Sequence, residues 1–496
     1  MPGFLSTCRN LKDWILQYPL VVIVLFCFIT RLPQLIGPQL MLDPDECVTA
    51  IMAKHFMNGD DFSLFFWGQK YGLTIFESAI IVPFYLVLGI NTIAVKLAML
   101  SLWTIGVIFL YKTLLAISHN DKLKSLLFTL VFISLPAWAI WSMKARGGYL
   151  TSFVLSSAIV YILFNKNSMQ KTFAYLLLGV IIELVYESQV LWLIGIIPLL
   201  IYSLTKQSNY KKISLLILTF FTTFFLLKYY KTSILYPYTP PISLPDIKNT
   251  SWYLLRFPEY LYNSLGGQYY FFFYQPINLV NAIISIITVI VLFILTATGI
   301  VFIIKRKWDK NSFIFSTLFF WGFLLFNFFT YKQDGRYLLP ISQFTLLSLY
   351  ILINSDSVNK KISTILVSII LIGSIGMCTF WNFEFEPNKK KEVQDIVTFL
   401  SKNNIRNAFT MDCPYPWFLM FYSNEKIIAR MPYYAGRSLA ICDAVNNNWR
   451  KGEKTALLNY AYMLPERDKG TVTIFNNFYV KINPSKEEIE SQFQFK

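Results

Sequence analysis

Residues Leu42 to Glu77 read LDPDECVTAIMAKHFMNGDDFSLFFWGQKYGLTIFE, and they come directly after the first long apolar segment of the chain. Three carboxylates, Asp43, Asp45 and Glu46, are therefore held next to a membrane. Carboxylates beside hydrocarbon are costly to desolvate, so a cluster of them in this place indicates a functional site. The alternative is an ordinary polar loop in which Asp43 or Asp45 caps a helix.

A short helix is predicted directly behind these acids. Side chains recur at helical spacing at five positions, Val48, Ile51, Met52, His55 and Phe56. This pattern is typical of an amphipathic helix that lies at the membrane surface. The loop that follows, WGQKYG at residues 67–72, is rich in hydrogen-bonding groups. Within this loop we expect Lys70 and Tyr71 to contact a substrate.

The composition is that of a polytopic membrane protein. Of the 496 residues, 55% are hydrophobic, 18% are aromatic and 15% are charged, which is too apolar for a soluble globular protein. The formal charge of +16 comes largely from lysines scattered in short clusters between apolar runs. Such scatter indicates membrane topology rather than a nucleic-acid groove. The first apolar run has no cleavage site behind it, so we expect an uncleaved helix.

About eleven apolar segments have the length of a membrane span. They cover approximately residues 14–36, 92–114, 125–141, 152–164, 173–185, 190–204, 213–227, 279–304, 313–330, 337–353 and 362–381. Segment 73–90 is ambiguous because it carries Glu77. If it does not span, six clusters of Lys and Arg fall on one side of the membrane, as the positive-inside rule requires. They lie at residues 9–12, 122–124, 166–171, 206–212, 305–310 and 360–361. We therefore expect residues 73–90 to be re-entrant or juxtamembrane and to return to the outer face.

This topology divides the chain into two parts. Residues 1–382 form an all-α transmembrane domain whose outer, catalytic loops are 37–91, 142–151, 228–278 and 331–336. Residues 383–496 form a small α/β domain outside the membrane, in which we predict a helix at 393–400 and strands at 408–411, 426–429 and 471–475. Cys413 and Cys442 lie in this tail, and their spacing does not decide whether they form a disulfide. No residue pattern in the tail indicates catalysis.

The second outer loop carries a pair of cations beside two glycines. Lys144 and Arg146 precede Gly147, Gly148 and Tyr149. A flexible backbone offers N–H groups to an anion, and arginine offers a fork of donors to phosphate. We expect Lys144, Arg146 and Tyr149 to bind substrate. The alternative is a helix break with snorkelling cations.

The remaining outer loops offer two more arginines. Arg256 lies among aromatic residues in an amphipathic stretch that could flank a polyprenyl chain, although aromatic belts occur in many membrane proteins. Arg336 and Tyr337 open an outer-face helix in YKQDGRYLLP, and Arg336 is either directed at a lipid phosphate or paired with Asp334. Glu183 and Glu187, four residues apart near the outer end of the predicted span 173–185, either face a cavity or pair with a neighbouring cation.

The order of these motifs resembles the GT-C superfamily of membrane glycosyltransferases, and within it the bacterial branch of protein O-mannosyltransferases and aminoarabinose transferases. The resemblance rests on the Asp45–Glu46 pair after the first helix, an interfacial helix, and the segment GQKYG leading to Glu77. It implies a GT-C fold with juxtamembrane helices in the first outer loop. GT-C enzymes often carry an acid a few positions after the loop arginine. Thr151 stands there instead, which weakens any prediction of a metal.

Together these motifs predict transfer of a sugar from a polyprenyl-phosphate donor to a lipid, glycan or protein acceptor, on the outer face of the plasma (inner) membrane. Such a reaction needs a carboxylate base and cations on the leaving phosphate. We expect Asp45 to be the base, aligned with the Asp of the family's pair, with Glu46 and Asp43 as supporting acids. Lys70, Arg146 and Arg336 form the expected phosphate clamp, and Tyr71, Glu77, Lys144, Tyr149, Arg256 and Tyr337 are further substrate-binding residues. No cofactor, metal or nucleic acid is expected, since no phosphate-binding glycine loop is present.

Two other classes of protein could share these features. A flippase or transporter for lipids or lipid-linked sugars would place charges at mid-membrane and show internal repeats, and we find no repeat. A non-catalytic scaffold would have no reason to gather acids in its first loop.

Overall fold

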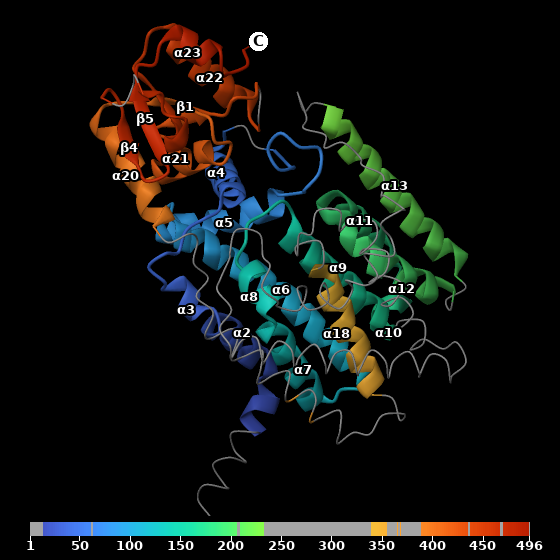
Figure 1. The fold of residues 1–496 in the computed structure, drawn as a ribbon. Coiled ribbons are helices and arrows are strands. Elements are labelled where there is room, and N and C mark those ends of the chain that lie inside the picture. Colours follow the sequence, from blue (N-terminus) through green and yellow to red (C-terminus); the bar gives the residue numbers. More distant parts are fainter. Residues whose placement is uncertain are drawn as a thin grey trace, which may run out of the picture.

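The computed structural model describes residues 13–60, 63–205, 209–232, 339–354, 388–434, 437–466 and 470–495, with positions 365 and 368. Apolar helices make up the larger part, and a small sheet with its own helices follows at the C-terminus (Figure 1). The C-terminal segment lies at one end of the helix bundle, beside α4 (Pro44–Asn58) and α5 (Ile75–Leu88). The predicted all-helical membrane part with a small α/β segment is confirmed at this level.

The bundle is built around α6 (Thr92–Ile117) and α9 (Tyr149–Phe164), which pack against each other. Gly106 permits this approach, because a Cβ atom at this position would lie 2.5 Å from the ring of Phe153. Trp103 of α6 is fully buried against Phe132 and Trp138. Large buried rings of this kind contribute strongly to the stability of a core.

Other helices surround this pair. They are α2 (Pro19–Ile29), α3 (Leu32–Leu35), α7 (Lys122–Ser134), α8 (Pro136–Trp141), α10 (Lys166–Gln170), α11 (Thr172–Gln189), α12 (Leu193–Thr205), α13 (Tyr210–Thr232) and α18 (Leu339–Ile353). Pro136 separates α7 from α8, since proline cannot continue a helix. The backbone of Gln189 is extended, with φ −153° and ψ 102°, so α11 ends there and a 3₁₀ turn, Val190–Trp192, leads into α12.

These helices match the predicted spans in the described part of the chain. Thr92–Ile117, Thr172–Thr205 taken through its 3₁₀ turn, and Tyr210–Thr232 are long and apolar enough to cross a membrane. The spans predicted at 279–304 and 313–330, and nearly all of 362–381, lie outside the described residues, so the count of about eleven stays a prediction. α5 is a 14-residue helix, about 21 Å long, which is shorter than a hydrocarbon core of about 30 Å.

The helix predicted behind the first acids is present as α4, but it does not have the expected amphipathic character, and its position at the membrane surface stays a prediction. Its first three turns are buried on nearly every side, and Cys47, Ala50 and Ala53 are as inaccessible as Val48 and Ile51. α4 packs between α5 and the C-terminal helix α21 (Tyr415–Tyr422). The spacing of apolar residues identified the helix, but small residues on its other face admit a second packing partner.

The C-terminal segment is a two-faced mixed sheet with strand order β2-β1-β3-β5-β4. β1 (Asn407–Thr410) runs parallel to β2 (Ile428–Arg430) and to β3 (Thr455–Tyr460), and β5 (Phe478–Ile482) is antiparallel to β3 and to β4 (Thr473–Phe475). Alternate side chains face opposite layers. Ala408 belongs to the core continuous with α21 and the bundle, and Phe409 belongs to a separate cluster with Val445 and Ile489.

The predicted helix and three strands of the tail are found as α20 (Lys389–Lys402), β1, β2 and β4. The sequence interpretation missed β3, β5 and the helices α21, α22 (Leu439–Arg450) and α23 (Lys486–Glu490). Cys413 and Pro414 form a turn that leads directly into α21. Cys413 and Cys442 are free thiols, so they form no disulfide.

Candidate active site

The first-loop acids begin α4, and two of them build its N-terminus. Asp43 is the N-cap residue, and its Oδ1 accepts the backbone N–H of Glu46 at 2.8 Å. Glu46 Oε2 accepts the backbone N–H of Asp43 at 2.9 Å, which completes a capping box. The alternative considered from sequence, a helix cap at Asp43, is therefore correct for this residue.

The same two carboxylates are also neutralised by buried lysines. Glu46 Oε1 lies 2.5 Å from Lys96 Nζ of α6, and Asp43 Oδ2 lies 2.7 Å from Lys144 Nζ. Burial opposes ionisation of Asp43, but Lys144 and Arg146 outweigh it and hold the pKa of this carboxyl well below its usual range. Asp43 and Glu46 are 1% and 0% exposed. Both carboxylates are therefore enclosed and paired within the described residues, and their role as supporting acids stays a prediction.

Asp45 is placed differently from its neighbours. Its side chain is 21% exposed, its Oδ2 lies 2.8 Å from Nη2 of Arg146, and its Oδ1 lies 2.5 Å from Nη2 of Arg437. Two guanidinium groups from distant parts of the chain thus hold one partly accessible carboxylate. Among the three first-loop acids, Asp45 is the one that an incoming hydroxyl group can reach.

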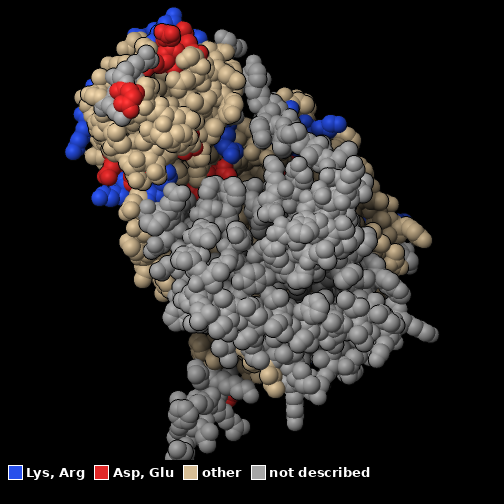
Figure 2. Space-filling view, viewed as in Figure 1, with Lys and Arg blue, Asp and Glu red and all other residues tan. Residues whose placement is uncertain are grey.

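The cluster is not acidic in balance, although its sequence is. Three carboxylates, Asp43, Asp45 and Glu46, are paired with four cations, Lys96, Lys144, Arg146 and Arg437. Charged side chains of both signs are visible where the C-terminal segment meets the bundle (Figure 2). Within the described residues, each of the three carboxylates therefore has at least one cationic partner.

The loop behind α4 turns back on itself next to this cluster. The backbone N–H of Phe66 donates to Gly72 O at 2.9 Å, and Phe65 and Leu73 form an antiparallel bridge. Lys70 and Tyr71 lie near the tip of this loop, half-buried and exposed respectively. At its base, the ring of Phe66 lies under the guanidinium of Arg437, 4.4 Å from the ring centroid. Both predicted loop residues therefore belong to the same region as Asp45.

The glycines of the second outer loop join three segments. Gly147 and Gly148 have φ of 57° and 81°, values that favour glycine. A Cβ on Gly148 would lie 3.2 Å from Leu73 N and from Ser188 Cα. The backbone N–H of Gly72 donates to Glu187 O at 2.9 Å. This close contact fixes the first loop against the second loop and the end of α11.

Glu77, a buried carboxylate in the first turn of α5, faces the start of α9. Burial raises the pKa of Glu77 to about 8, although the backbone N–H groups of Gly148, Thr151 and Leu150 face it and lower the pKa. Glu77 is fully buried. The sequence predicted that backbone N–H groups at Gly147 and Gly148 bind an anionic ligand. In the structure, the N–H group of Gly148 faces Glu77, which was itself predicted to bind substrate.

Comparison with solved structures identifies the architecture. ArnT from Cupriavidus metallidurans, solved with bound undecaprenyl phosphate, matches with a TM-score of 0.60 at 10% identity, over 96% of this chain and 99% of that chain. The apo oligosaccharyltransferase of Archaeoglobus fulgidus matches at 0.54 and 11% identity, over 91% and 70%. The mycobacterial arabinofuranosyltransferase AftD matches at 0.52 and 12% identity, over 90% and 35%. No family model and no curated protein sequence matches the chain.

The chain has the GT-C fold. The superfamily resemblance drawn from the first-loop motifs is confirmed at the level of the fold. The structural match extends over nearly the whole chain, whereas the motifs on which the resemblance rests lie within residues 45–77. The C-terminal segment is therefore part of what the GT-C neighbour ArnT shares with this chain.

Several predicted substrate residues have other surroundings in this GT-C fold. Lys144 and Arg146 lie in the irregular segment between α8 and α9, and both are buried in the ion pairs described above. They therefore do not snorkel toward water, and their contact with a substrate stays a prediction. Tyr149 is buried against Trp141 and Trp192, with ring centroids 5.1 and 6.2 Å away. Arg256, Arg336 and Tyr337 lie outside the described residues. Among the described residues, no group of His, Cys, Asp and Glu has a geometry that could hold a metal ion.

Of the two acids on α11, Glu187 follows one of the expectations drawn from the sequence. Glu187 pairs with Lys231 of α13, which fits the structural alternative. Glu183 is fully buried, and neither of its oxygens has a hydrogen-bond partner in the described part of the chain. Neither residue contacts the Asp45 cluster in the ion pairs found there.

Sequence reasoning missed Lys96 and Arg437. Lys96 is a single charge near the start of a long apolar helix, and an intramembrane cation of this kind usually has a buried partner. The sequence could therefore have predicted a buried anionic partner for Lys96. Arg437 lies in a tail without any recognisable motif, and nothing in the sequence links it to Asp45, 392 positions away.

Proposed function

We propose that this protein transfers a sugar from a polyprenyl-phosphate-linked donor to an acceptor hydroxyl group on the outer face of the plasma membrane. The observation that carries the proposal is the placement of Asp45. Among Asp43, Asp45 and Glu46 it is the partly exposed carboxylate, and Arg146 and Arg437 fix it in place. Glycosyl transfer from a lipid phosphate requires a fixed carboxylate base together with cations for the leaving phosphate.

The fold supports the class of donor. ArnT, which has the same fold, was solved with undecaprenyl phosphate bound. A polyprenyl phosphate therefore fits this architecture, and the apolar helices around the site provide surfaces for its chain.

In the proposed reaction, the bond between the sugar C1 and the phosphate oxygen breaks, and a bond between C1 and the acceptor oxygen forms. Asp45 takes the proton of the acceptor hydroxyl, and polyprenyl phosphate leaves with its charge stabilised by cations. Arg146 is held against Asp43 and Asp45 at 3.5 and 2.8 Å, so we assign it to orienting the base. Lys70, at the tip of the neighbouring loop, and Arg336 remain the proposed contacts to the phosphate.

The Asp45→Asn variant tests this proposal. The amide is nearly the same size as the carboxylate, and Arg146 keeps Asp43 as a partner, so the variant should fold and still bind donor. The rate of transfer should fall by roughly a hundredfold or more, the size of a lost general base. The assay follows consumption of polyprenyl-phosphate sugar and release of polyprenyl phosphate in purified membranes.

A matched control is Asp60→Asn, an exposed aspartate directly after α4, which should keep the parent rate. Equal rates for Asp45→Asn and the parent would refute Asp45 as the base. Movement of a lipid-linked sugar across the membrane without its consumption would instead identify the protein as a flippase.

A further inference from the structure

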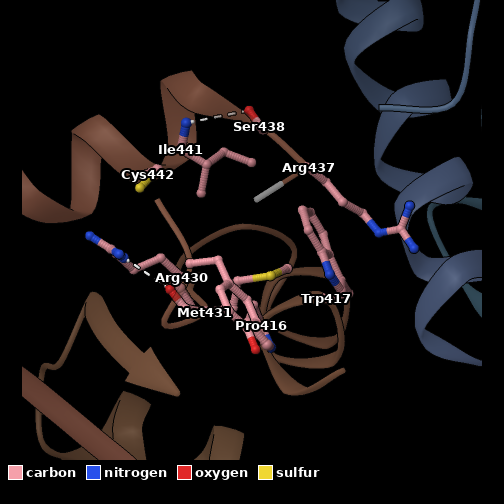
Figure 3. Close-up of a pocket in the computed structure, with 10 residues that line it drawn as sticks. Pro416, Trp417, Arg430, Met431, Arg437, Ser438, Ile441 and Cys442 are labelled. Carbon is pink, nitrogen blue, oxygen red and sulfur yellow. Dashed lines mark hydrogen bonds between the residues drawn. The ribbon is translucent and has the colours of Figure 1, made fainter. Parts of the chain in front are cut away.

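Arg437 reaches the first loop from the C-terminal segment. It directly precedes Ser438, the N-cap of α22, whose Oγ accepts the backbone N–H of Ile441 at 3.4 Å. The residue borders a small cavity that is also lined by Trp417, Arg430 and Met431. Figure 3 shows the guanidinium pointing out of this cavity, toward the blue helices of the N-terminal part. The side chain is therefore directed away from its own segment.

The guanidinium of Arg437 joins two parts of the first loop. It donates from Nη2 to Asp45 Oδ1 at 2.5 Å, and it lies over the ring of Phe66 at 4.4 Å. A cation over an aromatic face is attracted by the negative charge on the face of the ring. The side chain is 24% exposed, so it lies at the border between the protein and the space from which a substrate approaches.

Arg430 lines the same cavity and has a purely structural role in the C-terminal segment. Arg430 is buried, and its donors are taken by Asn446, Pro432, Gln494 and the carbonyl of Met431. All these partners are neutral groups of the C-terminal segment. Arg437, in contrast, makes its ion pair with a residue of the proposed site.

We propose that Arg437 is a positioning residue for the transfer reaction. A carboxylate offers about four lone-pair sites. Arg146 on Oδ2 and Arg437 on Oδ1 each use one, which fixes the plane of the carboxylate and leaves lone pairs for the acceptor proton. This inference rests on the proposed function and deepens it, because it makes the C-terminal segment a direct contributor to the geometry of the base.

Steady-state kinetics of Arg437→Ala and Arg437→Lys test the inference. In Arg437→Ala, kcat should fall by about tenfold to a hundredfold, the effect of a misplaced reacting group, while KM for the donor stays within about twofold. The acid limb of the pH–rate profile should move to higher pH, because a carboxylate that loses a neighbouring cation is protonated more easily. Arg437→Lys keeps the charge and should recover part of the rate.

Two controls separate positioning from docking of the tail. Glu425→Gln removes a different ion pair between the tail and α4, the pair with Lys54. Arg450→Ala removes an arginine that lies over Phe495 at 5.8 Å within the tail. Both variants should keep the parent kcat and acid limb, and thermal unfolding in detergent reports whether each variant folds.

The outcomes are distinguishable. A parent protein that releases no polyprenyl phosphate refutes the proposed function, and this inference falls with it. An active parent with an equally active or faster Arg437→Ala variant refutes the inference alone. Equal losses of kcat in Arg437→Ala and Glu425→Gln would also refute it, because they would show that the tail acts only by docking.

Discussion

At the scale of single residues, exposure to water separates three acids that look alike in sequence. Asp43 and Glu46 each have a buried lysine and a backbone N–H, whereas Asp45 lies between two guanidinium groups at the edge of the cluster. A buried ion pair contributes little net stability compared with apolar groups, but removal of one partner leaves an uncompensated charge. Substitution of Asp43 or Glu46 should therefore destabilise the fold, even though neither side chain is exposed.

Glu46→Gln should destabilise the fold rather than act on the chemistry alone. The amide oxygen can still accept the N–H of Asp43, but Lys96 would remain buried without its counter-charge. We expect a loss of about 3–5 kcal/mol in the free energy of unfolding, measured as a lower midpoint of thermal unfolding in detergent. The double variant Glu46→Gln with Lys96→Met removes both charges and should recover most of this loss. Equal midpoints for the single and double variants would contradict the pairing.

How much of this site was predictable depends on sequence distance. The acids, Lys70, Lys144 and Arg146 were identified because each stands in a short motif, and the cap at Asp43 follows from local spacing. The ion pairs were not predictable, since their partners are 50 positions away for Lys96, 101 for Lys144 and 392 for Arg437. Local patterns indicate which residue types gather, and only the packing of helices decides which cation meets which acid.

At the scale of elements, α4 is the helix at which the helix bundle and the C-terminal segment meet. Its C-terminal end is tied to the turn that follows α21 through Glu425, which lies 2.7 Å from Lys54 and 2.8 Å from His55. Tyr422 Oη accepts the backbone N–H of Leu42 at 3.0 Å at the other end. Helical spacing predicted α4, but its second partner lies in a tail whose central strands were missed, so its burial was not foreseen.

The pair between Glu425 and α4 should make stability depend on pH. Burial opposes ionisation of Glu425, but hydrogen bonds from His55 and Lys54 outweigh it and lower its pKa below 4.5. A carboxyl whose pKa is lowered by folding stabilises the fold above its unfolded pKa, and this contribution disappears as the pH falls through the folded pKa. The parent should therefore be more stable than Glu425→Gln at about pH 6, and the difference should shrink toward about pH 3.5.

Thermal unfolding of both proteins across this range measures the effect. Glu487→Gln, an exposed glutamate of α23, is the matched control and should follow the parent at every pH. A constant difference between the parent and Glu425→Gln over the whole range would show that the carboxylate charge is not what stabilises this contact.

At the scale of the whole molecule, the contacts between α4 and the tail require both to lie on the same side of the membrane. The distribution of lysines predicts that this side is extracytoplasmic. Alkaline phosphatase fused after Lys496 should therefore be active, and a fluorescent protein that folds only in the cytoplasm should stay dark at the same position. A bright fluorescent fusion would place the tail, and the Asp45 cluster with it, inside the cell.

The meeting of Asp45 with Arg437 also sets the time at which this site can exist during synthesis. A ribosome adds about 5–20 residues per second, so the 392 positions between them correspond to roughly 20–80 s. During that interval α4 has been synthesised but Arg437 has not. Until α21 is synthesised, the surface of α4 that α21 covers has no packing partner from the tail. A chain that stops before the tail can insert its helices yet never completes the cluster. Ribosomes arrested at successive lengths should therefore carry no transfer activity until the last part of the chain has emerged.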